Sequence, residues 1–318
     1  MNEFLTNDTK VILLLCGVFS KEQTVKPLSI QEYSALVSWL IKIKMRPSNL
    51  LQKDIIGDAS LNSGINKERL DALLARGIQL GFAVEEWQRN GIWIISRSDS
   101  DYPSLYKKHL REYAPPLLYG VGDRSLLKGG GLAIVGSRNI DKEGEHFTEE
   151  LAKYCVSKKM PVVSGGARGV DQIAMNTSLD CGGVTIGIIA DNLLKKSLIR
   201  QNRYAIAKKR LILISPYHPN SLFSVGTVMA RNKLIYAMAD YALVVSAEYK
   251  KGGTWAGAVE ELKRKNSRSV FVRLGENVPK GNLKLIDFGA KEWLGSIEKS
   301  NNNFNEKTQQ KFEQPTFL

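Results

Sequence analysis

Short apolar runs recur along the second part of the chain at intervals of about thirty residues. They lie at 133–135, 162–163, 185–189, 211–214, 242–245 and 270–272. Each run has the length of a buried parallel strand, and amphipathic stretches such as 149–155 and 258–264 lie between them. This alternation is typical of βα units. We therefore expect an α/β domain with a doubly wound, mostly parallel, Rossmann-like sheet over residues 101–295.

Before this region the apolar positions recur at spacings of three and four, which is the pattern of amphipathic helices. The pattern is clear at Tyr33–Ile41 and at Glu68–Gly77. The apolar run Val11–Phe19 is too short to cross a bilayer, so it predicts a buried helix. We expect a small helical N-terminal domain over residues 1–100.

Composition indicates the net charge of the chain and its cellular compartment. The 318 residues include 45 Lys and Arg against 32 Asp and Glu, a net charge of +13 that favours anionic partners. The three cysteines are far apart and indicate neither disulfides nor a metal site. Acidic residues near the start argue against a signal peptide, so we expect a cytoplasmic protein without a membrane partner. Residues 296–318 are polar and predict a disordered tail.

Two glycine-rich turns follow predicted strands, and each carries an arginine where a helix should begin. The first is Ile134–Arg138 and the second is Ser164–Asp171. A strand that stops at glycine and passes into a helix leaves backbone N–H groups pointing at one spot, and such a spot attracts phosphate. Because ligands of doubly wound sheets bind at the carboxyl ends of the strands, the two turns predict a phosphate-binding site.

Neither turn matches a common nucleotide motif. A P-loop needs a lysine followed by Ser or Thr after its glycines, and neither turn has that pair. A dinucleotide fingerprint needs G-x-G-x-x-G and an acidic residue at the end of the second strand, where this chain has Ser164. These departures disfavour ATP hydrolysis of the P-loop kind and NAD binding, and we expect no cofactor.

The segment Asn192–Ala239 holds nine Lys and Arg residues and no acidic residue. Solvent-exposed faces normally mix both signs, so unrelieved positive charge predicts a counter-charge from outside, for which nucleic-acid phosphate is the natural source. Four rings lie in this segment: Tyr204, Tyr217, His218 and Phe223. Single-strand binders combine stacking rings with basic grooves, although each ring here is equally well explained as a core or turn residue.

Seven motifs occur in a characteristic order: Asp101–Pro103, Pro115–Gly120, Ile134–Arg138, Ser164–Asp171, Gly182–Ile186, Arg231–Ile235 and Leu285–Ala290. In this order, over about residues 90 to 292, they resemble the DprA/Smf family of DNA-processing proteins. The resemblance implies a helical N-terminal domain, a Rossmann-like domain, a homodimer and single-stranded DNA binding. It also implies a RecA-type recombinase as partner, and no catalytic activity.

The resemblance assigns DNA contacts to twelve positions: Gly136, Ser137, Arg138, Ser164, Gly165, Gly166, Arg168, Gly169, Asp171, Arg231, Asn232 and Lys233. The phosphate-contacting side chains are Arg138, Arg168, Arg231 and Lys233, the last standing where the family has arginine. The glycines cradle phosphate through their backbone. We expect Asp171 to cap the following helix or to orient Arg168. Ser137 and Ser164 suit either a hydrogen-bond donor or a turn residue.

Three departures from the family pattern keep other functions open. Met175 replaces the family's histidine, and the winged helix of many members is expected to be missing after Ala290. The segment Lys251–Trp255 resembles the nucleotide loop of lysine-decarboxylase-like and SLOG proteins. Its residues Gly252, Gly253 and Thr254 form a candidate nucleotide loop at a predicted helix start.

Two alternative functions follow from these departures. The first is a SLOG-like nucleotide sensor or nucleosidase, which would use the candidate nucleotide loop and Glu260 as its carboxylate. The second is an antitoxin or anti-phage defence component that restrains a partner toxin. A released base would favour the first alternative, and a neighbouring toxin gene the second.

Overall fold

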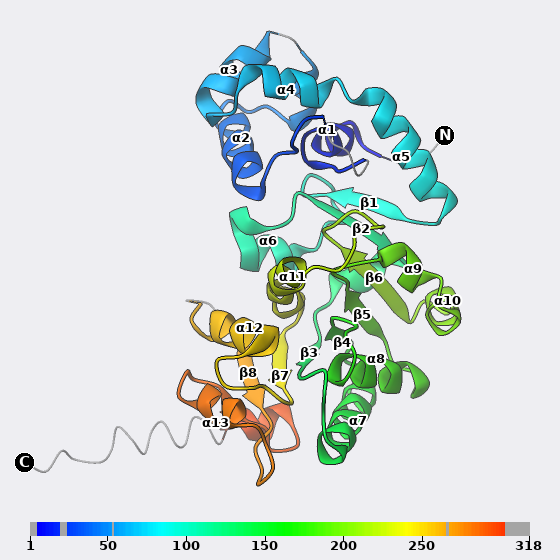
Figure 1. The fold of residues 1–318 in the computed structure, drawn as a ribbon, viewed down its shortest axis with the longest axis vertical. Coiled ribbons are helices and arrows are strands. Elements are labelled where there is room, and N and C mark those ends of the chain that lie inside the picture. Colours follow the sequence, from blue (N-terminus) through cyan, green and yellow to red (C-terminus); the bar gives the residue numbers. More distant parts are fainter. Residues whose placement is uncertain (1–4, 20–23, 53, 265–266, 303–318) are drawn as a thin grey trace, which may run out of the picture. The chain divides into compact units, whose positions relative to one another are not determined.

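The structure is a computed structural model, and it describes residues 5–19, 24–52, 54–264 and 267–302 (Figure 1). The chain forms two compact units, built from Met1–Lys128 with Ile189–Ser224 and from Gly129–Ile188 with Val225–Leu318. We call them unit 1 and unit 2 and describe each by itself. The domain boundaries predicted at residues 100 and 295 stay predictions.

The first part of unit 1 is helical. Its elements are α1 (Asn7–Cys16), α2 (Ile30–Lys42), η1 (Pro47–Leu51), α3 (Ile55–Ser63), α4 (Lys67–Leu74) and α5 (Gly77–Arg89). A capping box opens α2, because the side chains of Ser29 and Glu32 each accept a hydrogen bond from the other's backbone N–H. The apolar residues of α1 are buried, as predicted. None of the described helices is both long enough and apolar enough to cross a membrane.

Unit 1 also contains an antiparallel set of strands. They are β1 (Trp93–Ser96), β2 (Leu117–Val121) and β6 (Leu211–Ser215), and β2 pairs with both of the others. The remaining elements are α6 (Ser104–Leu110), η2 (Arg111–Tyr113), η3 (Arg124–Lys128), α9 (Leu193–Ser197) and α10 (Arg200–Ala207). The run predicted at 211–214 forms β6, and its pairing with β2 is antiparallel, since an apolar run does not encode the direction of a neighbouring strand.

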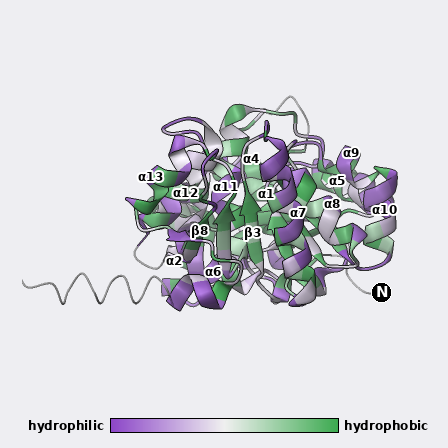
Figure 2. Ribbon diagram, turned by 90° about the horizontal axis from the view of Figure 1, so that it is seen from below, coloured by the Kyte–Doolittle hydropathy of each residue, from purple (hydrophilic) through white to green (hydrophobic). Residues whose placement is uncertain are grey.

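Unit 2 contains the parallel strands. In spatial order they are β5 (Thr185–Ile188), β4 (Val162–Ser164), β3 (Leu132–Val135), β7 (Tyr241–Val244), β8 (Ser269–Val272) and β9 (Lys291–Glu292). The helices are α7 (Lys142–Ser157), α8 (Val170–Asp180), α11 (Val225–Met238), α12 (Gly252–Leu262) and α13 (Lys280–Ile286). Figure 2 shows β3 and β8 in the green of hydrophobic residues, which fits strands covered on both faces. The predicted Rossmann-like fold with a mostly parallel sheet is confirmed.

The strand order of unit 2 turns back between β3 and β7. From β3 the chain continues to β4 and β5 on one side, whereas β7 leads to β8 and β9 on the other. Such a switch point is where doubly wound folds bind their ligands.

The predicted tail begins with structure rather than disorder. Residues 297–302 are helical, and Ile297 N–H donates to the hydroxyl of Tyr154 at 3.3 Å. Ser300 is buried, and its hydroxyl donates to the Ser296 carbonyl at 2.6 Å. Composition alone assigns these residues to a disordered tail, but the two contacts keep them in the folded chain. Residues 303–318 lie outside the described residues.

Candidate nucleic-acid interface

Three strand-to-helix turns lie side by side at the carboxyl edge of the unit 2 strands. Turn 1 (136–141) joins β3 to α7, turn 2 (165–169) joins β4 to α8, and turn 3 (245–251) joins β7 to α12. β4 and β7 pair in parallel with the two sides of β3, so the three strands end at the same edge. The structure thus brings the two predicted glycine turns and the candidate nucleotide loop together.

Turns 1 and 2 are in direct contact through their backbones. Val170 N–H donates to the Ser137 carbonyl at 3.2 Å. Gly169 has a φ of 85°, and a Cβ there would lie 2.4 Å from the Ser137 carbonyl oxygen, so glycine is required. A Cβ on Gly136 would lie 2.4 Å from Cγ2 of Val170. These two glycines allow the turns to approach each other.

The two serines of the turns hold the local backbone. The buried Ser164 hydroxyl donates to the Ile134 carbonyl at 2.7 Å and so joins the ends of β4 and β3. The Ser137 hydroxyl accepts from Asn139 N–H at 3.2 Å within turn 1. The sequence leaves two roles open for these serines, that of a hydrogen-bond donor and that of a turn residue. In the structure both hydroxyls make contacts inside the fold.

Two arginines are exposed at this edge. They are Arg138 on turn 1 and Arg168 on turn 2. Nη2 of Arg168 donates to Oδ1 of Asn139 at 2.5 Å, so this guanidinium reaches turn 1. Sequence reasoning missed Asn139, although asparagine is a common turn residue and follows Arg138 directly. Lys233, another predicted phosphate contact, is half-buried on α11.

Arg231 lies inside the fold rather than on this surface. Its side chain belongs to a residue only 3% exposed, and Nη1 donates to the Ile188 carbonyl at 2.7 Å. A Cβ on Gly165 would lie 1.5 Å from the same nitrogen, so the guanidinium fills the space beside turn 2. In this structure Arg231 supports turn 2 from within, and its predicted phosphate contact stays a prediction.

Asp171 is a buried acid that stabilises turn 2. Its Oδ2 accepts from Ala167 N–H at 3.4 Å, a capping contact with the turn backbone. Burial raises the pKa of the Asp171 carboxyl above its ordinary value, and the positive charge of Arg231 opposes that rise. The Asp171 carboxyl thus stabilises the backbone of turn 2.

The start of α12, directly after turn 3, is tied to turn 1 and α11 by two side chains. The Thr254 hydroxyl donates to the Gly136 carbonyl at 3.1 Å, which joins α12 to turn 1. Asn232 of α11 lies against Gly253, where a Cβ would come within 2.6 Å of Nδ2. Gly252 is exposed and has a φ of 78°. The candidate nucleotide loop is thus part of the same edge.

The edge has a positive character from two sources. α12 begins here, and the first N–H groups of a helix lack partners within it. Exposed positive charge comes from Arg138, Arg168, Lys250 and Lys251, and it exceeds the exposed negative charge of Asp141 and Glu248 in the same turns. This arrangement suits a row of phosphates. No cluster of three or more His, Cys, Asp and Glu side chains suited to a metal ion occurs in the described parts of the chain.

The acid-free segment is shared between the two units, and acids from elsewhere in the sequence neutralise part of it. In unit 1, Lys196 pairs with Asp191 at 3.0 Å and Lys209 with Asp123 at 3.7 Å. The other exposed cations of α10, Arg200 and Arg203, keep the surface of unit 1 basic. An external counter-charge is thus needed for only part of the segment.

The rings of this segment have different environments. His218 packs edge-on against Trp87, with ring centroids 5.8 Å apart, and burial lowers its pKa. Tyr204 is 60% exposed, and Nζ of Lys208 lies 5.7 Å from its ring centroid. Tyr204 therefore has a ring that a base can reach, whereas His218 is a packing residue.

Comparison with known sequences identifies relatives over most of unit 2 and part of unit 1. The family described as DNA recombination-mediator protein A matches residues 93–305. DNA processing protein DprA of Bacillus subtilis is 30% identical over 213 residues, which cover 64% of this chain and 69% of that protein. DprA of Streptococcus pneumoniae is 31% identical over 191 residues, 56% of this chain and 63% of the relative. Protein Smf of Synechocystis is 31% identical over 175 residues, 53% of this chain and 43% of the relative.

Solved structures with the same fold come from this group. The X-ray structure of DprA from S. pneumoniae has a TM-score of 0.71 and 23% identity, and the match covers 91% of this chain and 95% of that one. The structure of DprA from Helicobacter pylori has a TM-score of 0.54 and 25% identity, over 69% of this chain and 96% of that one. The resemblance found in the motifs is confirmed, and the chain belongs to the DNA recombination-mediator protein A family, the DprA/Smf proteins.

Proposed function

We propose that this chain binds single-stranded DNA at the edge formed by turns 1, 2 and 3, and that it acts in DNA processing and recombination by binding rather than by catalysis. The observation that carries the proposal is the gathering of the N-terminus of α12 and the exposed Arg138 and Arg168 at one edge. The H. pylori relative is described by its single-stranded DNA binding mode, which supports the same ligand here.

The salt dependence of binding tests this proposal. Each phosphate contact that a cation makes with a single strand adds about 0.7 to the slope of log affinity against log salt. Arg168→Ala should therefore weaken binding of a labelled oligo-thymidine and reduce the slope by about that amount. Fluorescence anisotropy at several salt concentrations, with a duplex of the same length in parallel, measures both.

Arg89→Ala is the matched control, because Arg89 is an exposed arginine of unit 1 that pairs with Glu85. Its slope should equal that of the unchanged chain. The proposal fails if the two variants behave alike, or if the chain does not bind the oligonucleotide at low salt.

We also propose that the chain works as a homodimer in the cytoplasm and delivers a RecA-type recombinase to the bound strand, as its family membership suggests. Light scattering should then give twice the 35.4 kDa of one chain. Recombinase assembly on a protein-covered strand should be faster when the chain is present. A monomer in solution, or an unchanged assembly rate, would contradict the respective part.

The two alternative functions are not taken further. The Thr254 hydroxyl of the candidate nucleotide loop donates into the fold, and Glu260 is exposed and pairs with Arg264 at 3.0 Å. Neither residue offers the chemistry that a nucleosidase needs. The relatives found for this chain are named for DNA processing, which gives no support to toxin restraint.

A further inference from the structure

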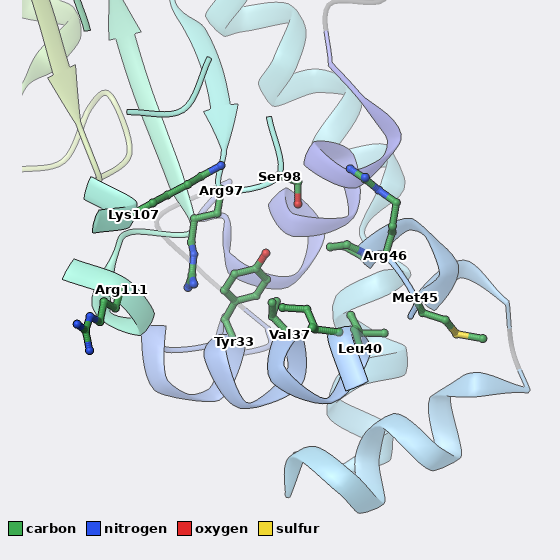
Figure 3. A pocket seen from close by; sticks show the side chains of 11 residues that line it. Tyr33, Val37, Leu40, Met45, Arg46, Arg97, Ser98, Lys107 and Arg111 are labelled. Atoms are coloured by element: carbon green, nitrogen blue, oxygen red, sulfur yellow. The ribbon is translucent and has the colours of Figure 1, made fainter. Parts of the chain in front are cut away.

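A pocket of about 460 Å³ lies within unit 1 (Figure 3). One face of α2 lines it with Tyr33, Val37, Leu40 and Ile41, whose spacing places them on the same side of a helix. Tyr33 and Leu40 are buried, and Met45 continues the apolar lining beyond the end of α2. The floor of the pocket is therefore apolar and mostly aliphatic.

Four cations surround this floor: Arg46, Arg97, Lys107 and Arg111. In Figure 3, Arg97, Lys107 and Arg111 lie on one side of Tyr33 and Arg46 on the other. None of the described residues that line the pocket is acidic. Arg46 is compensated by Asp8, at 2.5 Å.

The other cations of the rim are available to a ligand. Lys107 and Arg111 are exposed, and no acidic side chain in the described parts of the chain forms an ion pair with either. Arg97 donates to the Ser34 hydroxyl at 3.1 Å, a neutral partner. The rim thus has an excess of positive charge, which favours a ligand that combines an apolar group with anionic groups.

The apolar floor of the pocket limits the class of anionic ligand that can bind. A nucleic acid would use an open aromatic face for base stacking, but Tyr33 is only 1% exposed and the guanidinium carbon of Arg97 lies 5.7 Å from its ring centroid. Aliphatic floors accept aliphatic or aromatic side chains, and guanidinium groups pair well with carboxylates.

We propose that this pocket binds a short acidic segment of a partner protein. An apolar side chain of the segment packs against the accessible Val37 and Ile41, and neighbouring carboxylates pair with Arg97, Lys107 and Arg111. Charge complementarity and the aliphatic floor support this ligand, and both features are separate from the proposed DNA-binding edge in unit 2.

Selection of peptides on the full-length chain tests the proposal. A random peptide library displayed on phage should yield sequences in which Asp or Glu flanks Leu, Ile or Phe. Selected peptides, synthesised with a fluorescent label, should bind the double variant Lys107→Glu/Arg111→Glu about tenfold or more weakly, because two favourable charge contacts become repulsive. The control Lys42→Glu/Lys44→Glu makes the same charge change at two exposed lysines outside the lining and should bind like the unchanged chain.

Three outcomes would overturn the proposal. The first is no enrichment of acidic sequences, and the second is equal peptide affinity for both double variants. The third is loss of oligo-thymidine binding in Lys107→Glu/Arg111→Glu while the peptides bind unchanged, which would assign the pocket to nucleic acid. All four substituted lysines and arginines are exposed, so we expect the variants to keep the fold. Equal melting temperatures of the variants would exclude unfolding as the cause of weaker peptide binding.

Discussion

At the scale of single residues, Arg231 lies so close to Gly165 that a side chain at residue 165 must displace it. We expect Gly165→Ala to lower the free energy of unfolding by about 1–3 kcal/mol, because the new Cβ would lie 1.5 Å from Nη1 in a buried region. Urea denaturation measures the loss. In the control Gly57→Ala, the added Cβ in α3 meets nothing within 4 Å, and stability should hold or rise by about 1 kcal/mol. Equal losses at both glycines would contradict the role given to Arg231.

The Asp171 carboxyl should make stability depend on pH. Burial raises its pKa in the folded chain above the ordinary value of 3.8, so the folded state holds the proton more tightly than the unfolded state. Its contribution to stability is complete below the ordinary pKa and is lost as the pH rises through the folded pKa. Asp171→Asn removes this titration. From acid to neutral pH, the free energy of unfolding of Asp171→Asn should therefore rise relative to that of the unchanged chain. A difference that stays constant with pH would contradict the raised pKa of Asp171.

At the scale of elements, a buried ion pair fixes α12 to the start of β8. Nη1 of Arg268 lies 2.7 Å from Oε1 of Glu261, and both side chains are buried. Glu261→Ala leaves the guanidinium buried without its counter-charge, so we expect a loss of about 3–5 kcal/mol in urea denaturation. The neighbouring Glu260 is exposed, and Glu260→Ala should change stability by no more than about 0.5 kcal/mol. A similar cost for both substitutions would argue against the pair.

The strands of unit 2 were predictable because a strand covered on both faces must consist of apolar residues. Leu132–Val135 is buried throughout, and such runs return with the period of a βα unit. The antiparallel pairing of β6 was not predictable, because it depends on β2, whose residues lie far away in sequence. The turns were predictable from their glycines, but the contact between Gly136 and Val170 depends on the neighbouring strands.

The largest difference at the site concerns Arg231. A charged residue in a basic segment is expected on the surface, and nothing local in Arg231–Lys233 indicates burial. Its Nη1 donates to the Ile188 carbonyl at the end of β5 and fills the space beside Gly165, and only the folded chain brings these residues together. The burial of a charged side chain such as Arg231 thus follows from tertiary contacts and is not apparent from composition.

At the scale of the whole molecule, the three cysteines should differ in reactivity. Cys181 is exposed, whereas burial raises the pKa of Cys155 to about 12 and also raises that of Cys16. Because the thiolate is the reactive form, a thiol reagent near neutral pH should modify Cys181 rapidly in the native chain. Urea should release the other two groups, and Cys181→Ser should abolish the fast phase. Rapid reaction of the native Cys181→Ser chain would contradict the raised pKa values of Cys16 and Cys155.

Neighbouring residues of α11 reach two different turns. Arg231 supports turn 2, and Asn232 lies against Gly253 at the start of α12. Successive residues of a helix point about 100° apart, so α11 acts as a bracket between the two sites. We expect a DNA strand bound at turn 2 to restrict the start of α12 through α11. An oligonucleotide long enough to reach both should then gain more affinity than two shorter pieces together.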